Sequence, residues 1–112
     1  MLPIVLFALA ALGGIVLAIL RFQGRPTLPL GLAVGHGLVG AAGLVTLIWA
    51  VFGTGLAAKA SLGLFLVAAL GGFVLFSFQL RKKPIPIGVM LVHALVAVIA
   101  FGLLLARVHG GA

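Results

Sequence analysis

Four long apolar runs divide this sequence, and short polar segments separate them. The runs span approximately residues 2–20, 28–52, 61–80 and 87–106. Each is close to the roughly 20 apolar residues that a helix needs to cross a bilayer core. Because lipid offers no hydrogen-bonding partner, a spanning segment must satisfy its backbone internally, which a helix does. The runs therefore predict four transmembrane helices.

The connections between these runs are short. They cover residues 21–27, 53–60 and 81–86. Short connections force neighbouring helices to run antiparallel, as in an up-down bundle. The predicted fold is an all-α integral membrane protein, a four-helix up-down transmembrane bundle forming a single membrane domain over residues 1–112.

The composition excludes a water-soluble domain and much enzyme chemistry. Of the residues, 65% are hydrophobic and 6% are charged, the mean hydropathy is +1.52, and Asp, Glu and Cys are absent. Soluble domains carry about 25% charged residues. Without carboxylates or thiols, one chain cannot build paired-carboxylate hydrolysis, a thiolate nucleophile or a Cys-based zinc site. We therefore expect no enzymatic activity.

The basic residues predict an orientation. Five of the seven lie in segments 21–27 and 81–86, whereas Lys59 and Arg107 lie beyond the other helix ends. By the positive-inside rule, both termini face away from the cytoplasm. Basic residues in short loops favour anionic lipid headgroups over nucleic acid as their partner. Together with the Ala, Gly, Leu and Val bias, this indicates a multi-pass protein of a bacterial inner membrane.

The sequence also contains an internal repeat. The twelve residues from Leu6 recur from Leu64 with nine identities, an offset of 58 residues. A Pro, Gly and His spaced alike in 29–36 recur in 86–93, an offset of 57. The sequence therefore predicts two tandem helical hairpins, about 2–52 and 61–106, related by a pseudo-twofold axis along the membrane normal.

Each predicted hairpin carries one histidine inside its second helix. At about 1.5 Å per residue, His36 lies roughly 12 Å into the hydrocarbon and His93 about 9–10 Å. An ionisable group at such depth is costly and indicates a functional site. One and two turns further along the same helix faces lie small residues. They are Gly40 and Gly43 after His36, and Ala97 and Ala100 after His93.

Two imidazoles above a trough of small residues suit a flat cofactor, and haem b is the candidate. His36 and His93 would be its axial ligands, and Arg25 or Lys82 would meet the propionates. In ligand type the chain resembles the four-helix membrane cytochromes of the b type. Its single histidine pair would hold one haem, and electron transfer is the function that the resemblance implies.

Other interpretations stay open. Each histidine can donate a hydrogen bond across the bundle while small residues allow close packing, which would suit an accessory subunit of a larger membrane complex or a homo-oligomer. The pair can also bind another metal, contact a quinone or relay protons. A small channel or transporter with a histidine-gated anion path is a further hypothesis.

Overall fold

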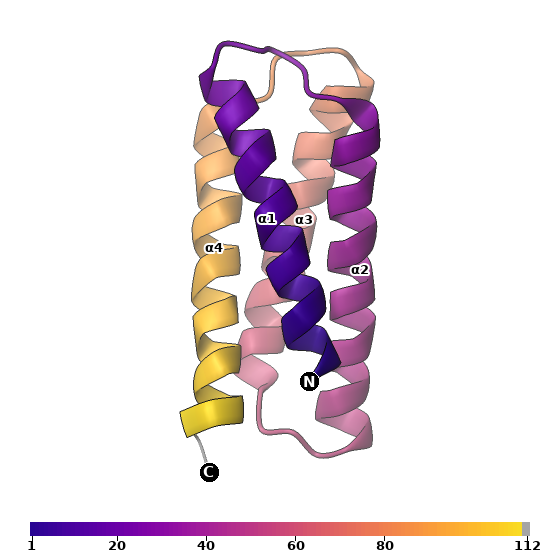
Figure 1. Ribbon diagram of the computed structural model, residues 1–112, viewed down its shortest axis with the longest axis vertical. Coiled ribbons are helices and arrows are strands. Elements are labelled where there is room, and N and C mark those ends of the chain that lie inside the picture. Colours follow the sequence, from indigo (N-terminus) through magenta and orange to yellow (C-terminus); the bar gives the residue numbers. More distant parts are fainter. Residues whose placement is uncertain (111–112) are drawn as a thin grey trace.

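The computed structural model describes residues 1–110 and consists of four long helices joined by short connections (Figure 1). The helices are α1 (Leu2–Phe22), α2 (Leu30–Gly53), α3 (Lys59–Leu80) and α4 (Ile87–Leu105), and α4 continues into a short π-helix, η1 (Ala106–Gly110). Each long helix is apolar enough and long enough to cross a membrane. The four predicted helices are therefore confirmed, and no helix end is displaced by more than two residues.

Proline and left-handed residues set the helix ends. Pro29 and Pro86 are the residues before the first turns of α2 and α4, where a missing amide proton costs nothing. After α1 and α3 the chain turns through left-handed residues, Gly24 at φ +94° and Lys82 at φ +55°. The two hairpins thus begin and end their helices in corresponding ways.

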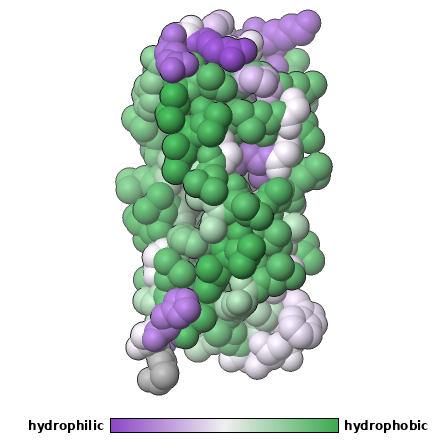
Figure 2. All heavy atoms as spheres, in the orientation of Figure 1, coloured by the Kyte–Doolittle hydropathy of each residue, from purple (hydrophilic) through white to green (hydrophobic). Residues whose placement is uncertain are grey.

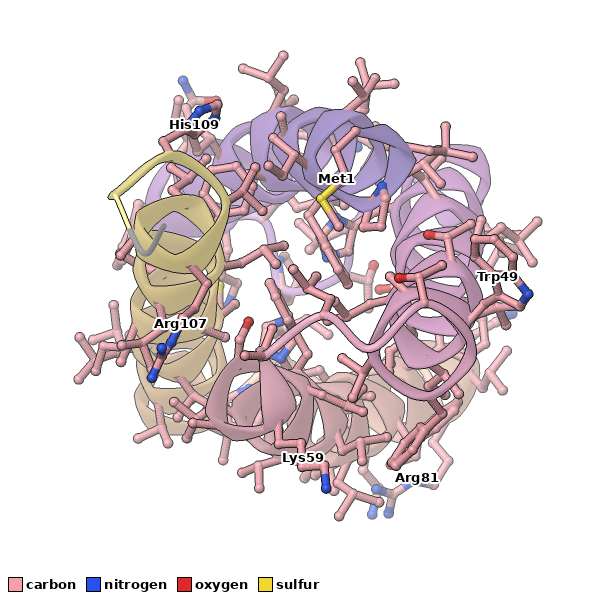
Figure 3. The ribbon with its side chains drawn as sticks, turned by 90° about the horizontal axis from the view of Figure 1, so that it is seen from below. Met1, Trp49, Lys59, Arg81, Arg107 and His109 are labelled. Carbon is pink, nitrogen blue, oxygen red and sulfur yellow. The ribbon has the colours of Figure 1, made fainter. Side chains whose placement is uncertain are left out.

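The helices form a square in which neighbours along the chain are neighbours in space. Helix α1 packs on α2 and α4, and α3 packs on α2 and α4, so α1 faces α3 across the diagonal (Figure 3). The α1–α2 and α3–α4 connections meet at one end (Figure 1). The N-terminus, the α2–α3 connection and η1 lie at the other end, in a bundle 44 Å long.

The buried core lies in the half of the bundle nearer the N-terminus. The phenyl rings of Phe7 and Phe65 stack at its centre with centroids 3.7 Å apart and planes 3° from parallel. Leu47 and Leu104 are fully buried beside them. The outward surface is apolar along the length of the helices, and hydrophilic side chains gather at the end with the two paired connections (Figure 2).

Hydrogen bonds between the two hairpins close that hydrophilic end. The Arg21 Nε donates to the carbonyl of Ile85 at 2.9 Å, and the Ile85 amide donates to the carbonyl of Pro26 at 2.9 Å. The Gln79 side-chain amide donates to the carbonyl of Leu28, and its Oε1 accepts from the Leu28 amide at 3.0 Å. Each hairpin therefore holds the connection of the other.

Candidate functional site: a facing histidine pair

Each intrahelical histidine is anchored to the preceding helix of its own hairpin. The Nδ1 of His36 lies 2.7 Å from the carbonyl oxygen of Ala10, and the Nδ1 of His93 lies 2.7 Å from that of Ala68. A carbonyl oxygen only accepts hydrogen bonds, so each Nδ1 carries the proton. In the neutral imidazole the lone pair is then on Nε2.

Glycine pairs in α1 and α3 allow the two imidazoles to come close enough to bond to these carbonyl oxygens. A helical carbonyl points toward the residues three and four positions onward, which here are Gly13 and Gly14 after Ala10. A Cβ on Gly14 would lie 3.0 Å from Cε1 of His36, closer than such contacts normally come. Gly71 and Gly72 stand in the same relation to His93, with a Cβ on Gly72 3.3 Å from its Cε1. We call each glycine pair a histidine seat.

The two imidazoles face each other across the bundle. Their centroids lie 6.3 Å apart and their planes are at 82°. They come from α2 and α4, which sit on the second diagonal of the square, and both residues are partly buried. Among residues 1–110 no group of three or more His, Cys, Asp or Glu side chains gathers, so any metal ion here would take two protein ligands.

The pair has the features of a two-imidazole metal site. Metal-binding histidines usually donate their second ring N–H to a carboxylate or backbone carbonyl, which fixes the tautomer and ring orientation. Both histidines have that bond. Two imidazoles whose ring centroids lie 6.3 Å apart could both bind one ion that lies between them.

Comparison with protein-family models, with curated proteins and with solved structures finds no match to this chain.

The small residues predicted to form a trough do not all border open space. The Phe7 ring fills the space beside Gly43, where a Cβ would lie 2.9 Å from Cε1 of that ring. Ala100 is fully buried, and its carbonyl accepts from the Ser61 hydroxyl at 2.8 Å. Gly40 and Ala97 are partly buried. The phenyl stack therefore limits the trough on the side nearer the termini.

The predicted propionate partners lie in the connections at the hydrophilic end. Arg25 and Lys82 are both exposed there. Arg21, which sequence reasoning did not select, is partly buried on α1, seven residues beyond Gly14, or about 10 Å along the helix axis. The offset of 58 aligns Arg21 with Gln79, so the repeat could have drawn attention to Arg21. In the structure each of these side chains bonds to the connection of the other hairpin.

The histidine seats were also missed at the sequence level, although both glycine pairs lie in the twelve-residue segments that begin at Leu6 and Leu64. These glycines lie on α1 and α3, the helices against which the imidazoles pack, and not on α2 and α4, which carry the histidines. Two glycines recurring in each first helix, with one histidine in each second helix, were the signal for the seats.

A groove between α3 and α4 leads to His93. Its volume is about 290 Å³, and valine side chains make up most of its wall. It is lined by Val67, Ala68, Leu70, Gly71, Val74, Val89, Val92, His93 and Val96. The imidazole is the one ionisable group in this lining, so an apolar molecule can approach the candidate site from the side of the bundle.

Proposed function

We propose that this chain is a membrane-spanning electron-transfer protein in which the imidazoles of His36 and His93 would hold one haem b. The observation that carries the proposal is the pair of imidazoles 6.3 Å apart, each with Nδ1 bound to a backbone carbonyl. That arrangement leaves the Nε2 of each ring as the electron-pair donor. The proposal assigns no catalytic residue.

The membrane setting of this proposal rests on the surface of the bundle. Four helices of sufficient length and hydropathy present apolar side chains outward along their length. Burying those side chains in lipid removes the cost of exposing them to water. We propose a bacterial inner membrane, with both termini outside the cytoplasm and the hydrophilic end inside. We also propose that the matching histidine seats descend from one duplicated hairpin.

The protein's part in haem binding is to present two neutral, oriented imidazoles. The carbonyls of Ala10 and Ala68 accept hydrogen bonds from the Nδ1 protons, which fixes the tautomer of each imidazole and stops the rings from rotating. Because the rings rest against the glycine seats, they sit back toward α1 and α3. Haem, when bound, would supply reversible one-electron chemistry at a potential that the residues holding it and their surroundings tune.

Basic side chains at the hydrophilic end would meet the haem propionates. Arg25 and Lys82 are candidates, and Arg21 joins them because it lies on α1 closer to the histidine level. A guanidinium pairs with a carboxylate through two parallel hydrogen bonds. Since the chain has no Asp or Glu, no side-chain carboxylate competes for these cations.

A cofactor-free structural subunit is the second candidate, and the histidine hydrogen bonds favour it as well. Each bond joins the two helices of a hairpin and satisfies a ring nitrogen without any metal. On this hypothesis the imidazoles contribute packing and specificity to a subunit or homo-oligomer. The two candidates differ in the role of the Nε2 atom of each histidine. Haem binding needs this atom as an electron-pair donor, whereas a structural subunit does not use it.

The absorption spectrum of the protein purified in mild detergent from haem-replete cells tests the proposal. We expect a Soret band, with sharp α and β bands after reduction by dithionite. His36→Asn and His93→Asn keep an amide N–H donor near the Nδ1 position and remove Nε2, so each should lose the spectrum while remaining folded.

His109→Ala is the matched control, because His109 lies exposed in η1. It should leave the spectrum unchanged. A colourless wild-type protein, or a spectrum that survives both asparagine variants, would contradict haem ligation by this pair and favour the structural subunit.

A further inference from the structure

A hollow at the end with the termini carries two basic side chains. Its volume is about 590 Å³, and it lies where the α2–α3 connection passes the start of α3 and the end of α4. Lys59 of α3 and Arg107 of η1 both line it. Figure 3 shows these two side chains on neighbouring helices at this end of the bundle. This basic hollow lies far from the five cations of the hydrophilic end.

Backbone donors at the start of α3 add to the positive potential there. Ala58, the residue before the first turn, makes no side-chain capping bond, and the first turn contains no acidic residue. The first amide groups of a helix have no partner within it and carry partial positive charge. Those of Lys59, Ala60 and Ser61 belong to residues that line the hollow.

The remaining walls of the hollow are apolar. Val51 and Leu56 on one side and Leu103 on the other provide aliphatic surface. The exposed ring of Phe52 also lines it, and the Lys59 ammonium lies 5.9 Å from the centroid of that ring. A ligand that fits both surfaces has an anionic head and an apolar body.

The basic side chains depart from the internal repeat. By the offset of 58, Lys59 corresponds to Met1 and Ser61 to Pro3, and by the offset of 57, Arg107 corresponds to the buried Ala50. The histidine seats match closely in the two hairpins, whereas the positions that correspond to Lys59 and Arg107 in the first copy of the repeat carry no charged side chain. Repeat symmetry therefore does not account for them.

We propose that the basic hollow binds the phosphodiester headgroup of one anionic phospholipid, with its acyl chains against the apolar wall. Lys59 and Arg107 contact the phosphate, and the first amides of α3 reinforce that contact. Because the site lies at a helix end, it meets the depth of lipid headgroups. The inference rests on the membrane-spanning part of the proposed function and is independent of haem.

Native mass spectrometry of the full-length chain tests this site. The protein is released from nanodiscs of equal phosphatidylglycerol and phosphatidylcholine, and the retained lipid is counted. We expect preferential retention of one phosphatidylglycerol. Lys59→Gln with Arg107→Gln should reduce that retention on the order of tenfold. Ala60→Asp should reduce it too, although a carboxylate in the first turn favours the helix itself.

Arg81→Gln with Lys83→Gln is the matched control, because both residues are exposed at the hydrophilic end and their change removes the same charge there. It should keep the retained lipid. Equal loss in both double variants would show diffuse attraction and overturn the site, as would equal retention of the two lipids by the wild type. Colourless protein that retains phosphatidylglycerol would contradict haem binding while supporting the basic hollow.

Discussion

The phenyl rings of Phe7 and Phe65 stack face to face, 3.7 Å between centroids, although they belong to helices on opposite corners of the square. Backbone contact between α1 and α3 is absent within residues 1–110, so these two side chains join the hairpins through the centre. Their positions correspond in the repeat, separated by its offset of 58 residues. Within this stack, the Phe7 ring also fills the space beside Gly43, seven residues after His36 on α2.

Removing one ring of this stack should destabilise the bundle. Phe7→Ala leaves a cavity next to Gly43 and Phe65, and large-to-small changes of this kind cost about 3 kcal/mol or more. The free energy of unfolding in mild detergent measures the effect. Phe73→Ala is the control, because Phe73 is 72% exposed and its loss should change stability by less than about 0.5 kcal/mol. Equal effects of both changes would show that the stack contributes nothing special.

Closing a histidine seat should displace its imidazole. Gly14→Ala puts a methyl group 3.0 Å from Cε1 of His36, so we expect a loss of about 1–3 kcal/mol in the free energy of unfolding. Gly72→Ala should cost less, because its methyl would lie 3.3 Å from His93. Gly35→Ala, whose methyl meets nothing within 4 Å, should be neutral or stabilising. If the seats serve haem ligation, Gly14→Ala also shifts or weakens the Soret band.

The two hydrogen bonds between the Gln79 side chain and the Leu28 backbone join the hairpins, and a negative charge at Gln79 should weaken them. Gln79→Glu preserves the side-chain shape but replaces the amide donor with an oxygen facing the Leu28 carbonyl. We expect a loss of about 1–3 kcal/mol in the free energy of unfolding. Gln23→Glu adds the same charge at the end of α1, where Gln23 is exposed, and should cost less than about 1 kcal/mol. Equal losses of stability in the two variants would show that the charge acts on the helix dipole and not on the hydrogen bonds between Gln79 and Leu28.

The proposed orientation predicts which connections a membrane-impermeant maleimide reaches. The sequence has no cysteine, so a single introduced thiol gives an unambiguous label. In intact spheroplasts Ala57→Cys, in the α2–α3 connection, should react at once. Gln23→Cys, at the end of α1, should react only after the membrane is permeabilised. The reverse pattern would contradict the placement of both termini outside the cytoplasm.

The four helices and their order could be predicted because their causes are local. Apolar runs, prolines before α2 and α4, and short connections specify helices and reversals from neighbouring residues alone. The predicted ends differ from the observed ones by two residues at most. The repeat likewise places His36 and His93 in corresponding positions, so the histidines were selected without any structure.

The residues that surround the histidines could be identified only from the tertiary structure. Gly43 and Ala100 were expected to border open space, yet Phe7 fills the space at Gly43 and Ala100 is fully buried. A residue in a helix faces its neighbours at three and four positions along the chain, but what lies opposite depends on the partner helix. Sequence periodicity predicts which residues share a face of one helix, but it does not predict which residues of another helix pack against that face.

The sequence by itself determined four long apolar helices, their antiparallel order, the placement of most charge at one end and the pairing of one histidine with each hairpin. These follow from hydropathy, chain connectivity and spacing, which need no knowledge of packing. Only the tertiary structure decided that the glycine pairs seat the imidazoles, that Phe7 stacks on Phe65 and that Arg21 holds the connection before α4. Each is a contact between residues at least 21 positions apart. Its geometry depends on how the helices rotate about their axes when they pack.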